Sequence, residues 1–175
     1  MTKIIAATLV LAVCRGFGPR QTTWTRNSLY FKDASVEMPG KLKNSSKQKP
    51  DKSHPTYADD HAFHGNFGRI DVYIMDAKLR KEGVPSSQTT ADILLKGFAR
   101  LHGLKLGKPK AYKSPIGRNG LQLVAAASKG TEQFGVVVHS ASKGARQVNI
   151  RIAWPRSDKS ALDMAFRISN SLRFN

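Results

Sequence analysis

The sequence has a single cysteine, few acidic residues and no hydrophobic run long enough to cross a membrane. With Cys14 as the only cysteine, the chain can build neither an internal disulfide nor a zinc knuckle. The longest apolar run covers only residues 4–13, whereas a membrane-spanning helix needs about 20 residues. No nucleophile-elbow serine, phosphate-binding loop, helix-turn-helix or zinc-finger pattern is present, so the sequence identifies no catalytic residue and no cofactor.

The scarcity of acids leaves 12 Asp+Glu against 29 Lys+Arg and a net charge of +17. Such an excess favours contact with polyanions, namely an acidic protein, an acidic polysaccharide, an anionic membrane surface or nucleic acid. A high net charge also keeps an extracellular protein soluble, so the total charge does not choose among these partners.

The N-terminal residues are typical of an export signal. Lys3 precedes the short apolar run 4–13, and small residues follow, which predicts a signal peptide over 1–14 with a second candidate cut near residue 18. We therefore expect export to a periplasm or to the medium. Residues 11–14 also match a lipoprotein box that would attach a lipid to Cys14, and a buried N-terminal strand or helix is the alternative to export.

The remaining sequence predicts a polar spacer over 15–28 and a single α+β domain over 29–175. Period-two alternation predicts strands at 29–31, 36–38 and 67–75, with a basic flexible loop over 41–57. Apolar spacing predicts a helix over 91–102, which ends at Gly103, and a last helix that Ser157 caps.

Between the two helices the pattern predicts a meander. A weak strand over 104–113 is followed by strands at 121–128, 132–140 and 146–154, which short glycine turns separate. Such turns join antiparallel neighbours. The predicted fold is an antiparallel sheet, made of an N-terminal hairpin, one strand and a three- or four-strand meander, flanked by two amphipathic helices.

This order resembles the Mog1/PsbP-like α/β/α sandwich. The segments that carry the resemblance are 29–39, 91–102, 121–154 and the closing helix, so it covers most of the chain beyond residue 28. Members of that group are mostly non-enzymatic accessory or binding proteins, several of them exported. The resemblance implies that class of protein and assigns no functional residue.

The positive charge is gathered in the meander. Residues 57–104 contain six basic and six acidic residues, whereas 105–156 contain ten basic residues and only Glu132 as an acid. We interpret this segment as a binding surface for an anionic partner, formed by Lys105, Lys108, Lys110, Lys113, Arg118, Lys143, Arg146 and Arg151. Lysines of this kind also protect sheet edges from unwanted pairing. Tyr112 is the only candidate for stacking on bases, which argues against sequence-specific nucleic-acid binding.

One polar cluster resembles a set of metal ligands, namely Asp59, Asp60, His61 and His64. It offers an alternative function as a metal-dependent hydrolase, although a polar turn explains the same residues. Asp71 and Asp76 have opposite parity along their strand, so we expect them on different faces.

A third hypothesis is a cytoplasmic protein that binds nucleic acid without sequence specificity. The sequence favours an exported, non-enzymatic binding or accessory protein.

Overall fold

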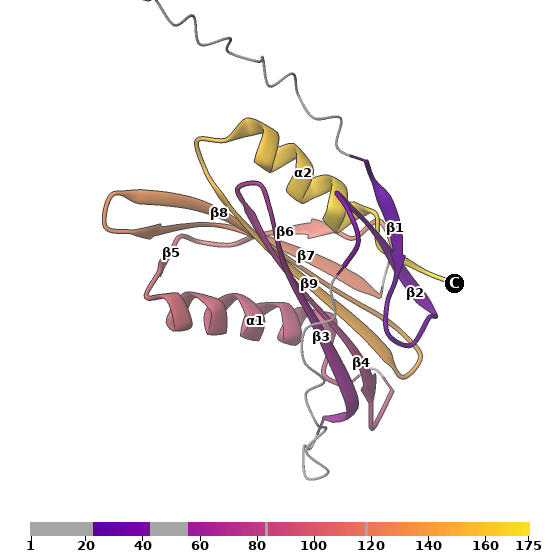
Figure 1. Cartoon of the computed structure of the whole chain (residues 1–175). Coiled ribbons are helices and arrows are strands. Elements are labelled where there is room, and N and C mark those ends of the chain that lie inside the picture. The colour runs from indigo at the N-terminus through magenta and orange to yellow at the C-terminus, as the bar shows by residue number, and fades with distance from the viewer. Residues whose placement is uncertain (1–22, 43–55, 83, 118) are drawn as a thin grey trace, which may run out of the picture.

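A computed structural model describes residues 23–42, 56–82, 84–117 and 119–175. These residues form two helices and two antiparallel sheets (Figure 1). The three-stranded sheet has the order β1-β2-β10 and the large sheet the order β3-β4-β9-β8-β7-β5, with β6 also pairing with β7. The elements in chain order are β1 (Thr25–Ser28), β2 (Ala34–Met38), β3 (Tyr57–Phe67), β4 (Ile70–Leu79), α1 (Ser87–His102), β5 (Lys105–Leu106), β6 (Lys110–Lys113), β7 (Gly120–Lys129), β8 (Glu132–Lys143), β9 (Arg146–Pro155), α2 (Lys159–Asn170) and β10 (Arg173–Phe174).

The large sheet separates two layers. Helix α1 packs on β7, β8 and β9 on one side, which we call the α1 face, and α2 packs on β8 and β9 on the other, the α2 face (Figure 1). Alternating side chains of the sheet supply both cores, because neighbouring strand residues point to opposite faces. Val136 and Val138 are buried under α1, and Ile150 and Ile152 are buried under α2. The predicted α+β class is therefore confirmed.

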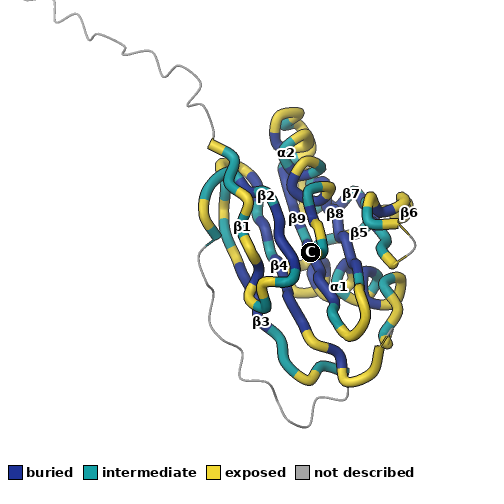
Figure 2. The backbone as a smooth tube through the Cα atoms, turned by 90° about the vertical axis from the view of Figure 1, so that its right-hand side faces the viewer, coloured by how far each residue is buried: buried dark blue, intermediate teal, exposed yellow. Residues whose placement is uncertain are grey.

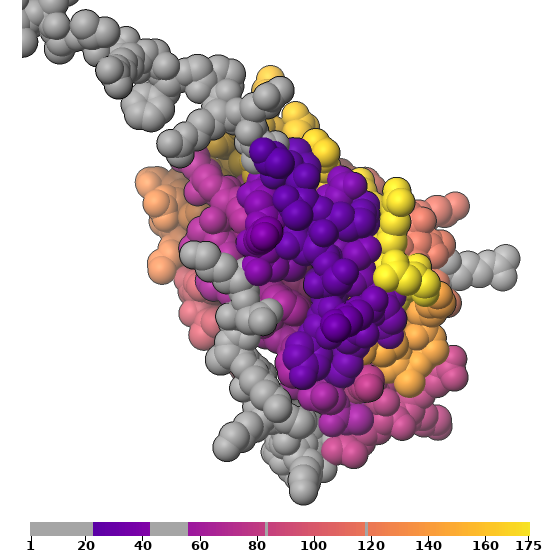
Figure 3. All heavy atoms as spheres, turned by 45° about the vertical axis from the view of Figure 1, so that its right-hand side comes forward, coloured from indigo at the N-terminus to yellow at the C-terminus, as the bar shows by residue number. Residues whose placement is uncertain are grey.

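The small sheet completes the layer on the α2 face. Leu29, Val36 and Met38 are buried in the same core as Ile150 and the apolar side of α2. Figure 3 shows the β1–β2 hairpin beside the last residues of the chain, where β10 pairs with β2. The prediction that the hairpin belongs to the main sheet is therefore wrong, because β2 pairs with the distant C-terminal strand, which the sequence did not predict.

Both predicted helices form, with their ends set by local capping. The hydroxyl of Ser86 accepts a hydrogen bond from the Thr89 N–H at 3.2 Å, and Gly103 adopts the left-handed conformation expected of a helix C-cap. The N-cap of α2 is Asp158 and not Ser157, since the Asp158 carboxylate accepts a hydrogen bond from the Ala161 N–H at 3.0 Å.

The meander forms as predicted, but the N-terminal strands differ from the prediction. Residues 25–28, expected in the spacer, form β1, and residues 29–31 form a turn that buries Leu29. The expected strand at 67–75 forms as β4, which begins at Ile70 after a turn at Gly68, and the strand before that turn, β3, was not predicted. The weak strand 104–113 divides into β5 and β6.

Some predictions lie outside the described residues, namely the signal peptide at 1–14, most of the spacer, most of the 41–57 loop and Arg118. Where it is described, the chain contains no helix that is both long and apolar enough to cross a membrane.

The expectation that Asp71 and Asp76 lie on different faces is confirmed, because Asp71 pairs with Arg151 on the α1 face and Asp76 pairs with Arg146 on the α2 face.

Candidate functional site

Four lysines lie along one edge of the large sheet. Strands β5 and β6 pair only with β7, so their outer sides have no strand partner among the described residues. Figure 2 shows β6 at the rim, away from β1 and β2. We call the four exposed lysines of this edge, Lys105, Lys108, Lys110 and Lys113, the lysine edge. It contains half of the residues that the sequence predicted for an anionic partner.

The register of β6 on β7 sends its side chains to both faces of the sheet. Lys110 lies opposite Val124, which packs in the core of the α2 face. Lys113 lies opposite Leu121, which packs in the core under α1. Directly paired residues of antiparallel strands point to the same side. Lys110 and Lys113 therefore point to opposite faces.

The charge of the lysine edge is not neutralised within the described part of the chain. None of the ion pairs there involves any of its four lysines. Lys143, another predicted residue, lies at the far end of β8, where its Nζ donates a hydrogen bond to the carbonyl of Asn175 at 2.6 Å. An anion that reached the lysine edge would meet positive charge without displacing an internal acid.

Two of the predicted residues, Arg146 and Arg151, belong to internal ion pairs that the sequence did not predict. The Arg146 side chain is 11% exposed and bonds to Asp76, and the Arg151 side chain is 12% exposed and bonds to Asp71 at 2.6 Å. The cause is the pairing of β4 with β9, which places the acids of one strand beside the arginines of the other. Both guanidinium groups are therefore mostly buried and already bonded to an acid.

The four proposed metal ligands do not converge on one point. They lie in strand β3 and not in a turn. The buried imidazole of His61 has its Nε2 3.4 Å from Asp59, whereas the exposed imidazole of His64 has its Nε2 2.5 Å from Asp71. The described residues contain no group of three His, Cys, Asp or Glu side chains that could hold a metal ion. The geometry gives no support to a metal-dependent hydrolase.

A hollow of about 430 Å³ lies directly beside β6. Its lining includes Ala111, Tyr112 and Lys113 from the strand, Leu121 from β7, and the loop that joins the two strands. Tyr112 is 46% exposed. An apolar hollow therefore lies next to the lysine edge. The sequence did not predict this hollow, because the residues that line it come from two strands and a loop.

Two buried polar residues hold that loop in place. The Ser114 hydroxyl lies 2.7 Å from Nε2 of His139, and Nδ1 of His139 lies 2.7 Å from the Ser169 carbonyl. Burial lowers the pKa of His139, so the neutral ring donates from Nδ1 and accepts the Ser114 proton at Nε2. Ser114 resembles an activated nucleophile, but it is buried, and its oxygen also accepts the Ile116 N–H at 3.1 Å. The pair joins β8, α2 and the β6–β7 loop.

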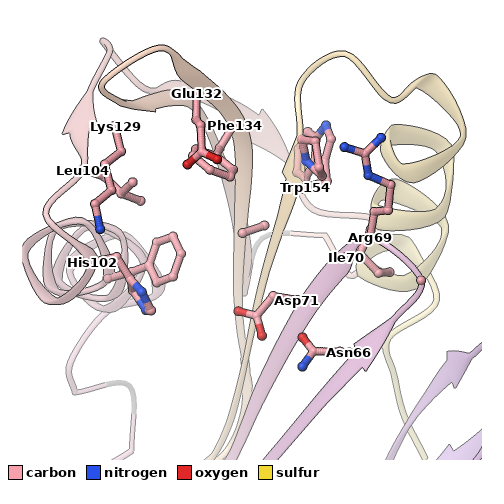
Figure 4. A pocket seen from close by; sticks show the side chains of 14 residues that line it. Asn66, Arg69, Ile70, Asp71, His102, Leu104, Lys129, Glu132, Phe134 and Trp154 are labelled. Carbon is pink, nitrogen blue, oxygen red and sulfur yellow. The ribbon is translucent and has the colours of Figure 1, made fainter.

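A second cavity of about 420 Å³ opens at the other end of the sheet (Figure 4). Phe98, Phe134 and Trp154 contribute to its lining, and the Asp71 carboxylate points into it from β4. The Asp71 carboxylate already forms an ion pair with Arg151, and Nε2 of His64 lies 2.5 Å from it. The cavity mixes cationic and anionic side chains, so its charge does not select a ligand.

Solved structures of PsbP and Mog1 share this fold, so the Mog1/PsbP-like fold predicted from element order is confirmed. The solution structure of cyanobacterial PsbP (CyanoP) from Synechocystis sp. PCC 6803 is similar with a TM-score of 0.61 at 10% identity, over 94% of this chain and 99% of that one. The Ran-binding protein Mog1p of Saccharomyces cerevisiae is similar with a TM-score of 0.52 at 11% identity, over 87% of this chain and 96% of that one. No family model and no curated protein matches this sequence. At such low identity the likeness concerns the fold alone.

Proposed function

We propose that the protein is an exported, non-catalytic binding or accessory protein that docks an anionic macromolecule through the lysine edge. The observation that carries this proposal is the set of four exposed lysines on an unpaired sheet edge, none with an acidic partner in the described residues. A neighbour in fold, Mog1p, is named as a Ran-binding protein, which is compatible with a role in binding.

Charge reversal on the lysine edge tests the docking proposal. The variant Lys110→Glu/Lys113→Glu is compared with Lys81→Glu/Lys159→Glu, which changes the net charge equally at exposed positions elsewhere. Because many weak contacts with a polyanion depend on local charge density, the edge variant should elute from immobilised heparin at a clearly lower salt concentration than the control. Equal elution of the two variants would contradict docking at this edge.

Export is a separate part of the proposal, and it rests on the pattern of residues 1–14. The protein recovered from the periplasm or medium should begin after residue 14 or 18, as N-terminal sequencing or intact mass would show. A mass increased by a lipid on Cys14 would identify the lipoprotein form. An intact Met1 on cytosolic protein would contradict export.

A further inference from the structure

We propose that the anionic partner is an acidic protein segment in extended conformation that pairs with β6 as an additional strand. This inference rests on the proposed function and adds the form of the partner. The outer side of β6 offers unpaired backbone N–H and C=O groups, since its only strand partner among the described residues is β7. Such an edge is the surface on which β-strand addition occurs.

The positions of the lysines fit a strand better than a flat surface. Side chains of an added strand alternate between the two faces of the sheet. Lys110 and Lys113 point to opposite faces and are three residues apart, so acids three positions apart in the added strand would lie beside both. The inferred partner segment therefore carries two acidic residues separated by two others.

The hollow beside β6 specifies what lies between the acids. Ala111 pairs with Leu123, which is buried under α1, and it therefore faces the same side as Lys113 and Leu121. A partner residue opposite Ala111 points to that face, and Ala111, Lys113 and Leu121 contribute to the lining of the hollow of about 430 Å³. The next partner residue lies against the exposed ring of Tyr112. Apolar side chains suit both positions, because water leaves the apolar surfaces when they pack together.

The order acid, apolar, apolar, acid is the same in both directions, so a Glu-Val-Val-Glu core fits a parallel or an antiparallel strand. A fluorescein-labelled peptide with this core should bind the full-length protein in an anisotropy titration. A peptide of equal composition with the core Glu-Glu-Val-Val places an acid opposite Ala111 in a parallel strand, or opposite Tyr112 in an antiparallel one, and should bind at least tenfold more weakly. The Lys110→Glu/Lys113→Glu variant should lose binding, and Lys81→Glu/Lys159→Glu should retain it.

Backbone pairing has its own signature. Alternate residues of a β-strand direct their N–H groups toward a given neighbour. N-methylation of one alternate set in the peptide should abolish binding, and N-methylation of the other set should leave it within threefold. Equal effects of the two sets, or equal affinity of the two cores, would overturn strand addition.

The arms of the experiment separate this inference from the proposed function. If heparin elution depends on the lysine edge but the Glu-Val-Val-Glu peptide does not bind, strand addition fails while anionic docking stands. If phosphatidylglycerol vesicles bind in a Lys110- and Lys113-dependent manner and the peptide does not, the partner is a membrane surface and the inference is wrong. Melting temperatures of both variants within a few degrees of the parent protein ensure that folding does not cause these results.

Discussion

Arg146 and Asp76 form a buried ion pair that fastens the small sheet to the large one. The Arg146 guanidinium on β9 bonds to the fully buried Asp76 carboxylate on β4 and lies 3.8 Å from the centroid of the Phe31 ring. The other Asp76 oxygen accepts the Phe31 N–H at 3.1 Å. Two side chains of the large sheet thus hold the turn between β1 and β2.

Loss of Arg146 should be strongly destabilising. In Arg146→Met the Asp76 charge remains buried without its partner, which typically costs about 3–5 kcal/mol of unfolding free energy. Urea denaturation at pH 7 measures this loss, with the exposed Arg156→Met as a control that should change little. A loss for Arg146→Met no larger than that of the control would show that the pair does not fasten the sheets.

The same variant should recover stability in acid. Burial raises the pKa of Asp76, and removal of Arg146 takes away an opposing effect, so the carboxyl of the folded variant takes up a proton more readily than in the unfolded chain. Protonation removes the buried charge. The stability difference between Arg146→Met and the parent should therefore shrink as the pH falls from 7 toward 4, and a constant difference would contradict this explanation.

His139 should make stability depend on pH in a mildly acidic range. Its pKa is lowered from 6.5 by burial, so below that pH the unfolded chain binds a proton that the folded protein does not. Unfolding free energy should therefore fall as the pH decreases below about 6.5. In His139→Gln this dependence should weaken, whereas the exposed His102→Gln should keep it. Denaturant titrations between pH 7.5 and 5 make the comparison.

Two glycines should respond to alanine in opposite directions. A Cβ on Gly135 would lie 2.3 Å from the indole of Trp154, so Gly135→Ala should cost about 1–3 kcal/mol through overpacking. Gly97 lies in α1 with no atom near its missing Cβ, and Gly97→Ala should stabilise by about 0.5–1 kcal/mol. Thermal unfolding of both variants tests the pair, and a stabilised Gly135→Ala would show that the indole moves aside easily.

Substitutions of Arg151 and Lys110 should have different effects, the first on the stability of the fold and the second on binding to heparin. Arg151→Gln removes the cation that pairs with the half-buried Asp71 and leaves it only the contact with His64, so it should lower unfolding free energy by about 1–3 kcal/mol, while heparin elution changes little. Lys110→Gln should lower the eluting salt and leave stability within about 0.5 kcal/mol, as expected of an exposed side chain. Loss of heparin affinity in a folded Arg151→Gln variant would show that Arg151 does contribute to the binding surface.

The elements with strong local signals could be predicted from the sequence. The strands of the meander alternate between glycine turns, and their ends agree closely with the prediction. Helix α1 ends before Gly103 as predicted but begins at Ser87, earlier than the predicted start at residue 91. Strand β3 was missed because Asp59, Asp60 and His61 resemble a polar turn. Among the described strands it pairs with β4 alone, and His61 is covered by the Tyr30 ring of the distant hairpin turn.

The sequence by itself determined the fold class, the two helices, the meander and the gathering of lysines at residues 105–113, because these follow from local periodicity and composition. Only the tertiary structure decided which lysine and arginine side chains form ion pairs with acids of the same chain. The pairing of β4 with β9 buries Arg146 and Arg151 against acids more than 60 positions away, while β6 lies at a rim where no acid reaches Lys110 or Lys113 in the described residues. The fate of a charge depends on its neighbours in space, and strand pairing at long range sets those neighbours.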